Sequence, residues 1–181
     1  MFGLFSKAYQ VSVPELHYRA LAERARDPVL YREFGVPDTL QGRFDLLVLH
    51  LVLLLRRLRT EGEIGEALGQ DIFDLFVRDM DRAMREMGVG DLGMKRRMRD
   101  MAKGFYARAG LYDPALEAGD HQALALALEQ SFFPNEPRAA AARGLAAWAL
   151  KTVTALRETA RGELLAGEAM FAALEPGLAQ A

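Results

Sequence analysis

The sequence predicts an all-α protein, a single globular bundle of several helices around one central apolar helix. Apolar residues recur at helical spacing along most of the chain, and no stretch alternates apolar and polar residues for long enough to indicate a strand. Of the 181 residues, 51% are hydrophobic, which suffices for one domain with a substantial core but not for two. We therefore expect a flexible N-terminus over residues 1–13, a helical domain over 14–161, and a weakly helical or frayed tail over 162–181.

The run FDLLVLHLVLLL, residues 44–55, marks the central helix, which we expect over about residues 39–61 with Asp38 or Thr39 as its N-cap. The run is too short to cross a membrane, because a span needs about 20 mainly apolar residues. A helix that is apolar on nearly all sides is instead expected in the middle of a core. Its main stripe comprises Leu40, Phe44, Leu47, Leu51, Leu54 and Leu58.

Capping residues and apolar periodicity predict the other helices in order. Pro14 suits the first turn of the N-terminal helix, and Asp120 is expected to cap a later one. At Tyr112, Asp113 and Pro114 we expect the preceding helix to have ended and a short separate segment to begin. The expected helices cover about residues 14–26, 28–35, 64–87, 92–109, 121–131, 137–161 and 163–174.

The stretch MREMGVGDLGMKRRM, residues 84–98, contains a literal GxGxxG in Gly88, Gly90 and Gly93. In a dinucleotide site this motif follows a strand and opens a helix within a βαβ unit. Here a helix precedes it, so we interpret Gly88 as the left-handed residue that ends one helix and Asp91 as the N-cap of the next. The motif therefore predicts a tight turn between two helices and not a nucleotide site.

Neither nucleophilic nor metal chemistry is indicated. The chain has no cysteine, which excludes disulfides, thiolate ligands and cysteine nucleophiles. The three histidines are far apart and none lies in a metal-binding spacing, and the serines lack the setting of a nucleophile elbow. His50 lies within the central apolar helix, where a core histidine is favoured over a ligand or a base. We predict that the protein is not an enzyme and holds no cofactor or metal.

Charge points to one local surface. The formal net charge of −2 gives no overall electrostatic reason to bind nucleic acid, DNA included, or an anionic membrane. Within residues 91–108, however, six basic residues are accompanied by only two acidic ones. This excess is either a solvated helix face or a docking surface for RNA, the ribosome or anionic lipid. In the preceding helix we expect Asp74/Arg78 and Asp81/Arg85 as i, i+4 ion pairs.

Two segments, FDLLVLHLVLLLRRLR (44–59) and DIFDLFVRDMDRAMREMGVGDLGMKRRMRDMAKGFYAR (71–108), carry a distinctive order of features. An acidic helix with methionines leads into an RExGVGDxG turn, and a basic helix ending in FYxR follows. In this order they resemble the ubiquinol–cytochrome c chaperone family, which comprises assembly factors for cytochrome b of the respiratory bc1 complex. The resemblance covers roughly residues 30–157, with 73–108 as its specific part.

The resemblance implies a non-enzymatic, all-helical chaperone that binds newly made cytochrome b and supports assembly of the ubiquinol–cytochrome c reductase (bc1) complex. Mitochondrial relatives act with a partner subunit and also dock near the ribosomal exit tunnel. Because this chain lacks a long N-terminal presequence, we expect a bacterial member in the cytoplasm, peripheral to the inner membrane. The client- or partner-binding residues implied by the family motif are Asp79, Asp81, Arg85, Gly88, Gly90, Asp91, Lys95, Tyr106 and Arg108, to which the charge of the basic helix adds Arg99.

A chaperone for a membrane protein needs an exposed apolar groove with charged edges, because its client presents apolar segments and short charged loops. We expect residues 79–108 to border such a groove, together with Arg56 and Arg57 at the end of the central helix. Charge reversal at Lys95 and Arg99 is then expected to weaken client or ribosome binding without unfolding the protein. A helical protein that binds RNA or the ribosome is the alternative, and a helical bundle that binds a small ligand is a third possibility.

Overall fold

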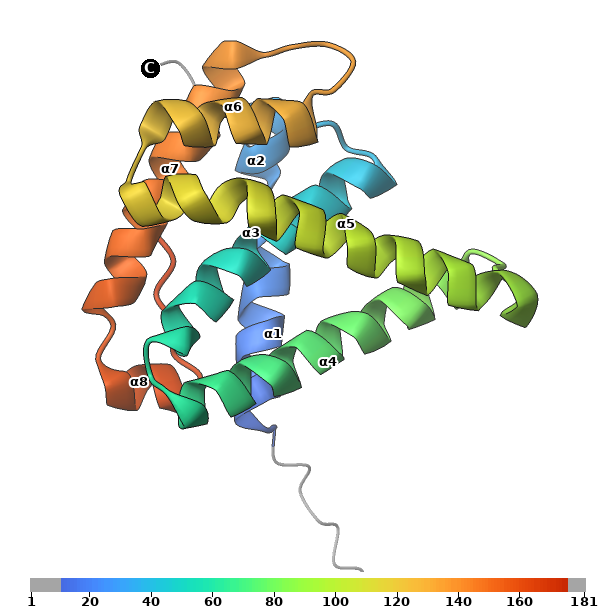
Figure 1. The fold of residues 1–181 in the computed structure, drawn as a ribbon, viewed down its shortest axis with the longest axis horizontal. Helices are drawn as coiled ribbons and strands as arrows, with labels where there is room; N and C mark the ends of the chain where they lie inside the picture. The colour runs from blue at the N-terminus through green and yellow to red at the C-terminus, as the bar shows by residue number, and fades with distance from the viewer. Residues whose placement is uncertain (1–10, 176–181) are drawn as a thin grey trace, which may run out of the picture.

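The computed structural model describes residues 11–175, which form eight α-helices and no strand. The all-α prediction is confirmed, and the first ten residues of the expected flexible N-terminus lie outside the described residues. The helices are α1 (Val13–Arg24), α2 (Pro28–Arg32), α3 (Leu40–Arg59), α4 (Glu63–Glu86), α5 (Asp91–Ala118), α6 (His121–Phe132), α7 (Ala139–Glu158) and α8 (Arg161–Ala166). Figure 1 shows how they are arranged around α3.

Helix α3 is the centre of the bundle, as the sequence predicts. It packs against α1, α4, α5, α6 and α7, and every residue from 46 to 54 is buried. The Thr39 hydroxyl oxygen caps the helix by accepting a hydrogen bond from the backbone N–H of Gly42 at 3.1 Å. Leu40 departs from the predicted buried stripe, because no helix covers it in the first turn and 70% of its surface is exposed.

His50 is a core residue, as expected. Its ring is fully buried, and Nδ1 lies 2.7 Å from the carbonyl oxygen of Leu46. The ring packs on Trp148 and Phe171, with centroid distances of 4.8 and 5.6 Å. Burial lowers the pKa of His50 to about 4, because an imidazolium would lose its hydration there. The side chain is therefore neutral and supports the core.

Helix α5 is longer than the sequence predicts. It runs without a break to Ala118 and contains Pro114 in its interior, so the predicted separate segment beginning at Tyr112 is wrong. A proline weakens a helix interior, because it removes one backbone hydrogen bond and crowds the preceding turn. Here Tyr112 and Leu116 are buried in the core, and this tertiary packing holds the helix together through the proline.

The chain after α7 returns to the body of the bundle. Helix α8 ends at Ala166, well before the predicted end of the last helix, because Gly167 adopts a φ of 98° that only glycine takes readily. The residues that follow carry no helix, yet Phe171 is buried. Residues 176–181 lie outside the described residues.

Helices α4 and α5 form a V-shaped hairpin, on which the candidate site depends. In Figure 1 the closed end of the V, the turn at residues 87–90, lies at the right edge of the molecule, beyond the other helices. Toward the open end, α4 packs against α1 and α3, whereas α5 packs against α3 and α6. Between the arms, the Phe76 ring of α4 contacts Phe44 of α3 and Phe105 of α5, with centroid distances of 6.2 and 6.0 Å.

Candidate functional site

A groove of about 1020 Å³ lies between the two arms of the V, in the half nearer the closed end. The end of α1 and the first turns of α3 complete its lining. The apolar residues that line it are Ala22, Ala25, Leu40, Phe44, Leu47, Met80, Ala83, Met84, Met87 and Met101. Methionine side chains are flexible and polarizable, so this lining can adapt to apolar partners of different shape.

Charged side chains line the edges of the groove, and arginines predominate among them. The charged lining residues are Arg26, Arg43, Arg82, Arg96, Arg97 and Arg108, with Asp79, Glu86 and Asp100. The ion pairs that involve the exposed ones are Arg43 with Asp38, Arg82 with Asp79, and Arg96 with Asp100. Arg26 and Arg97 form no ion pair within residues 11–175. The edge of the groove is therefore net positive.

Arg108 and Asp45 join α5 to α3 at the base of the groove. Arg108 Nε lies 2.5 Å from Asp45 Oδ1, and the carboxylate is only 1% exposed. The Arg108 guanidinium also lies 5.4 Å from the centroid of the Phe44 ring. Burial raises the pKa of Asp45 to about 6, although the charge of Arg108 acts to lower it. Gln41 also donates a hydrogen bond to Asp45 Oδ1 at 2.9 Å, but Arg108 supplies the opposite charge, and removing it would leave the buried carboxylate without a cationic partner. This pair therefore fixes where the α5 arm meets the body.

Asp79 ties the hairpin to α1. The Tyr18 hydroxyl donates a hydrogen bond to Asp79 Oδ2 at 2.8 Å, and Arg82 pairs with the other carboxylate oxygen. Burial and the hydrogen bond to Asp79 both raise the pKa of Tyr18, so the phenol remains protonated and continues to donate. Asp79 thereby positions the α4 arm and lines the groove at the same time.

Arg85 clamps the closed end of the V. Its Nε lies 2.8 Å from Asp81 Oδ2, and its Nη1 lies 2.9 Å from Asp91 Oδ1 across the turn. Gly88 adopts a φ of 83°, which confirms the predicted left-handed end of α4. The predicted capping role of Asp91 is wrong, because Gly90 is the N-cap of α5 and no side chain caps the helix. Asp91 is the first helical residue, and its carboxylate is engaged by Arg85.

The other ion pair predicted for α4 is also wrong. Arg78 Nε donates to the backbone carbonyl oxygen of Asp74 at 3.3 Å, and the Asp74 carboxylate accepts a hydrogen bond from Gln70 at 2.8 Å. The i, i+4 spacing brings Arg78 and Asp74 together, but a nearer amide donor occupies the carboxylate. Only the pair at the closed end of the V forms as predicted.

The charged end of α3 does not border the groove, contrary to expectation. Arg56 pairs with Asp113 at 2.8 Å, and Arg57 pairs with Glu61 at 2.5 Å. Both arginines line a separate cavity of about 330 Å³. They fall at the opposite end of α3 from the groove and join it to neighbouring elements of the body.

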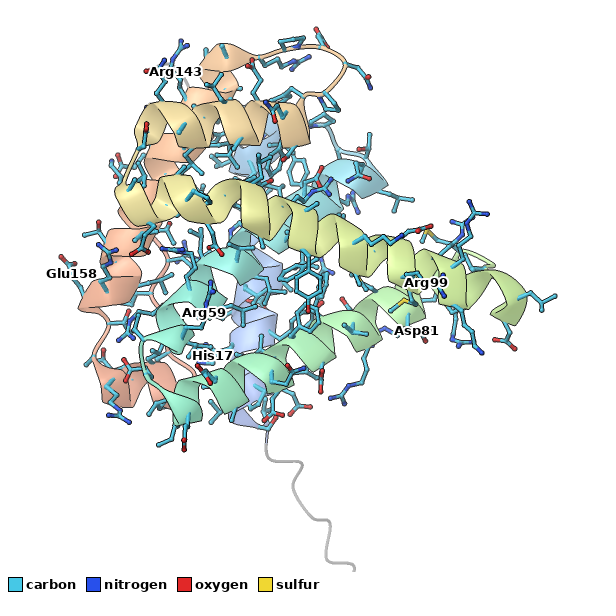
Figure 2. The ribbon with its side chains drawn as sticks, in the orientation of Figure 1. His17, Arg59, Asp81, Arg99, Arg143 and Glu158 are labelled. Carbon is cyan, nitrogen blue, oxygen red and sulfur yellow. The ribbon has the colours of Figure 1, made fainter. Side chains whose placement is uncertain are left out.

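Lys95, Arg99 and Tyr106 lie on the outer face of α5. They follow one another at helical spacing, all three are exposed, and none lines the groove. Figure 2 shows Arg99 on the α5 arm and Asp81 on the α4 arm, both near the closed end of the V. The predicted residues thus divide into a groove set (Asp79, Arg108), a turn set (Asp81, Arg85, Gly88, Gly90, Asp91) and an outer set (Lys95, Arg99, Tyr106).

Sequence patterns did not indicate the α1 and α3 side of the groove. Phe44 and Leu47 belong to the apolar stripe of the central helix and look like core positions. Tyr18 lies outside the segments that carry the resemblance and Asp45 is not among the predicted site residues, yet they hold Asp79 and Arg108. The one sequence signal for this side of the groove is Asp45, because a carboxylate within an apolar run needs a buried partner.

Within residues 11–175, no group of three or more histidine or acidic side chains is arranged to hold a metal ion. In the same range, none of the helices is both long enough and apolar enough to span a bilayer.

Comparison with known proteins finds a matching family and several similar proteins. The sequence profile described as Ubiquinol-cytochrome C chaperone matches residues 32–171. Ubiquinol-cytochrome c reductase complex assembly factor 1 of Mus musculus is 30% identical over 116 residues, which are 64% of this chain and 39% of that protein. The protein of that description from Xenopus laevis is 30% identical over 111 residues, 61% of this chain and 55% of its own length.

A solved structure is similar over most of both chains. The crystal structure of the Cbp3 homolog from Brucella abortus superposes with a TM-score of 0.83 at 38% sequence identity, covering 90% of each chain. By contrast, this chain spans less than two thirds of the length of the animal relatives. The profile match includes α3, α4 and α5 entirely, so three of the four helices that line the groove lie within it.

Proposed function

The chain belongs to the ubiquinol–cytochrome c chaperone family, and on that premise we propose that it is a non-enzymatic assembly chaperone for the ubiquinol–cytochrome c reductase (bc1) complex. Newly synthesised cytochrome b is the proposed client. The protein acts in the bacterial cytoplasm, peripheral to the inner membrane. The relatives' descriptions as assembly factors of that reductase complex support this proposal.

The groove between α4 and α5 is the observation that carries the proposal. Its apolar lining suits an apolar segment of a membrane protein before that segment is inserted, and its charged edges suit the polar flanks of such a segment. The lining methionines allow segments of different sequence to bind. A groove that stays open in the folded protein is what a holding chaperone needs.

The three sets of predicted residues take different roles in this proposal. Asp79 and Arg108 form the edge and base of the groove. Asp81, Arg85 and Asp91, with the two glycines of the turn, hold the closed end of the V and so set the width of the groove. The outer set lies away from the groove, so we assign it to a second contact, with the ribosome or a membrane surface.

A crosslinking pull-down from native membranes, read by mass spectrometry, tests the client and the groove together. The groove variant combines Leu40→Glu and Met87→Glu, at positions that are 70% and 52% exposed and line the groove. Because an apolar segment would have to bury the new carboxylates, we expect recovery of cytochrome b to fall by about tenfold or more. The exposed positions leave the core intact, so the melting temperature should be unchanged.

The matched control combines Ile64→Glu and Leu126→Glu, at positions that are 59% and 54% exposed and lie outside the groove. This control should recover as much cytochrome b as the wild type does. Equal recovery by the groove variant, or the absence of cytochrome b from the wild-type eluate, contradicts the proposal.

RNA or ribosome binding is the second candidate function. It is favoured by the exposed cations Lys95 and Arg99, which form no ion pair within residues 11–175. Binding of RNA that weakens steeply with salt and is lost on charge reversal at both positions would support it, because phosphate contacts release counterions. Ribosomal proteins or RNA in the pull-down without cytochrome b would give it priority.

A further inference from the structure

We propose that the outer face of α5 docks on the surface of an anionic lipid bilayer. The contact surface is a row of five side chains, named the outer stripe: Leu92, Lys95, Arg99, Lys103 and Tyr106. The inference rests on one part of the proposed function, namely that the protein acts at a membrane. It does not depend on which client the groove holds.

The outer stripe occupies one face of the helix. Its members are separated by three, four, four and three residues, and side chains at these spacings lie above one another on an α-helix. All five are exposed, and Leu92 and Tyr106 are 103% and 64% exposed. The Tyr106 ring also lies 6.3 Å from the Phe73 ring of α4, measured between centroids, so this end of the outer stripe adjoins the other arm of the V. Of the α5 residues that line the groove, Met101 and Arg108 project from the opposite face, whereas Arg96 lies beside the outer stripe at the edge of the groove. A ligand on the outer stripe therefore leaves the apolar lining of the groove open.

The three cations of the outer stripe form no ion pair within residues 11–175. The two acidic residues of the first half of α5 are already engaged, because Asp91 pairs with Arg85 and Asp100 pairs with Arg96. The outer stripe thus presents a row of positive charge with no acid of its own. Such a row is attracted by the negative potential of a leaflet that contains anionic lipid.

The apolar ends of the outer stripe favour a bilayer over a nucleic acid. Leu92 is fully exposed at the closed end of the V, which projects beyond the other helices in Figure 1. Side chains of this kind gain free energy by entering the apolar region beneath the lipid headgroups, whereas a phosphate backbone offers them no apolar environment. Tyr106, at the other end, suits the headgroup level, and the lysine and arginine stems can extend between.

Docking by this face would hold the groove close to the membrane. The groove lies across α5 from the outer stripe, so about one helix diameter, roughly 10 Å, separates it from the lipid surface. A segment that leaves or enters the bilayer would be within reach of the groove without crossing open water.

Co-sedimentation of the full chain with vesicles tests the inference. Vesicles of phosphatidylcholine alone are compared with vesicles that also contain phosphatidylglycerol. We expect binding only to the anionic vesicles. The triple variant Lys95→Glu, Arg99→Glu and Lys103→Glu should bind roughly a hundredfold more weakly, because each cation near an anionic surface contributes severalfold to affinity. Leu92→Gln should weaken binding about tenfold, since one apolar side chain no longer inserts.

The matched control reverses three exposed cations elsewhere, Arg32, Arg143 and Arg157, which form no ion pair within residues 11–175. Figure 2 shows Arg143 at the far side of the molecule from Arg99. The inference requires that this control keep at least most of the binding that the triple variant loses. Equal losses in the two variants would show a general charge effect and overturn it.

Two further outcomes would overturn the inference. One is the absence of binding to both kinds of vesicle. The other is preferential binding of the outer stripe to RNA, seen as a mobility shift that the triple variant loses while vesicles fail to compete. The client pull-down is separate, because it tests the groove. Absence of cytochrome b from the wild-type eluate, with vesicle binding retained, refutes only the proposed function. Recovery of cytochrome b without vesicle binding refutes only the bilayer contact.

Discussion

The body of the bundle, meaning all of it except the closed half of the V, differs from that half in how apolar and cationic side chains are placed. In the body, apolar side chains such as Trp148 are fully buried, and the cations Arg56 and Arg57 are paired with acids. In the closed half of the V, Leu92 is fully exposed and Lys95 has no ion pair within residues 11–175. Stability of the fold thus explains the burial and pairing of side chains in the body. It does not explain the exposed apolar and unpaired cationic side chains at the end of the V, and there we place the contacts with partners.

The two regions should differ most in how much the free energy of unfolding falls when a large side chain is truncated. Trp148 is fully buried and packs on His50, so Trp148→Ala should lower the free energy of unfolding by about 3 to 5 kcal/mol. Leu92→Ala should change it by less than about 0.5 kcal/mol, because that side chain is in solvent. Chemical denaturation measures both. A large loss for the Leu92 variant would show that the end of the V takes part in folding.

Asp45, where the body meets the V, should give stability a pH dependence. Its pKa in the folded protein is about 6, above its ordinary 3.8, so the folded state holds the proton more tightly than the unfolded state does. The stabilisation is complete below about pH 3.8 and is lost as the pH rises through about 6, on the order of 3 kcal/mol at most.

His50 acts in the opposite sense over the same range, because its pKa is lowered and its contribution is lost as the pH falls. The informative quantity is therefore the unfolding free energy of the wild type minus that of Asp45→Asn. We expect this difference to decline between about pH 4 and pH 6. A difference that stays constant with pH would mean that Asp45 is not the buried acid described above.

The stability of the turn at the closed end should depend on Gly88 more than on Gly90. Gly88 has a φ of 83°, whereas the N-cap Gly90 has a φ of −73°. Gly88→Ala should lower the free energy of unfolding by about 1 to 2 kcal/mol, because a Cβ is strained in the left-handed region. Gly90→Ala should have the smaller effect in the same thermal melts. The reverse order would refute the description of the turn.

Of the residues compared, Asp91 should contribute least to the stability of the fold. Its carboxylate is 90% exposed and pairs with Arg85 without capping α5, so Asp91→Ala should lower stability by less than about 0.5 kcal/mol. Asp120 accepts a hydrogen bond from the backbone N–H of Ala123 at 2.9 Å, and Asp120→Ala should therefore lower stability by about 1 kcal/mol. If the Asp91 variant melted lower than the Asp120 variant, the capping role would have to be restored to Asp91.

The body could be predicted from the sequence because its signals are local. The apolar run of α3 predicted the buried centre, and Thr39 and Asp120 predicted helix starts that the structure confirms. The unbroken helix through Pro114 could not be predicted, because the packing that maintains it comes from residues distant in sequence.

The candidate site could be predicted only in part. The motif from residue 79 to 108 identified the two arms of the V, but the first turn of α3 completes the groove, and Leu40 was expected in the core. Periodicity reports which residues share a face of one helix, and it does not report where another helix stops covering that face. Asp45 and Tyr18 were missed for a related reason, since their partners lie on other helices.

The most direct test of the central claim is site-specific photocrosslinking in cells, with the crosslinking side chain placed at one position at a time. Met84 lies in the groove, Lys95 lies on the outer stripe, and Leu126 is exposed on the body. The account predicts crosslinks to cytochrome b from position 84 and none from position 126, with position 95 crosslinking to other components. Crosslinks to cytochrome b from position 126 but not from position 84 would contradict the assignment of the groove as the client site.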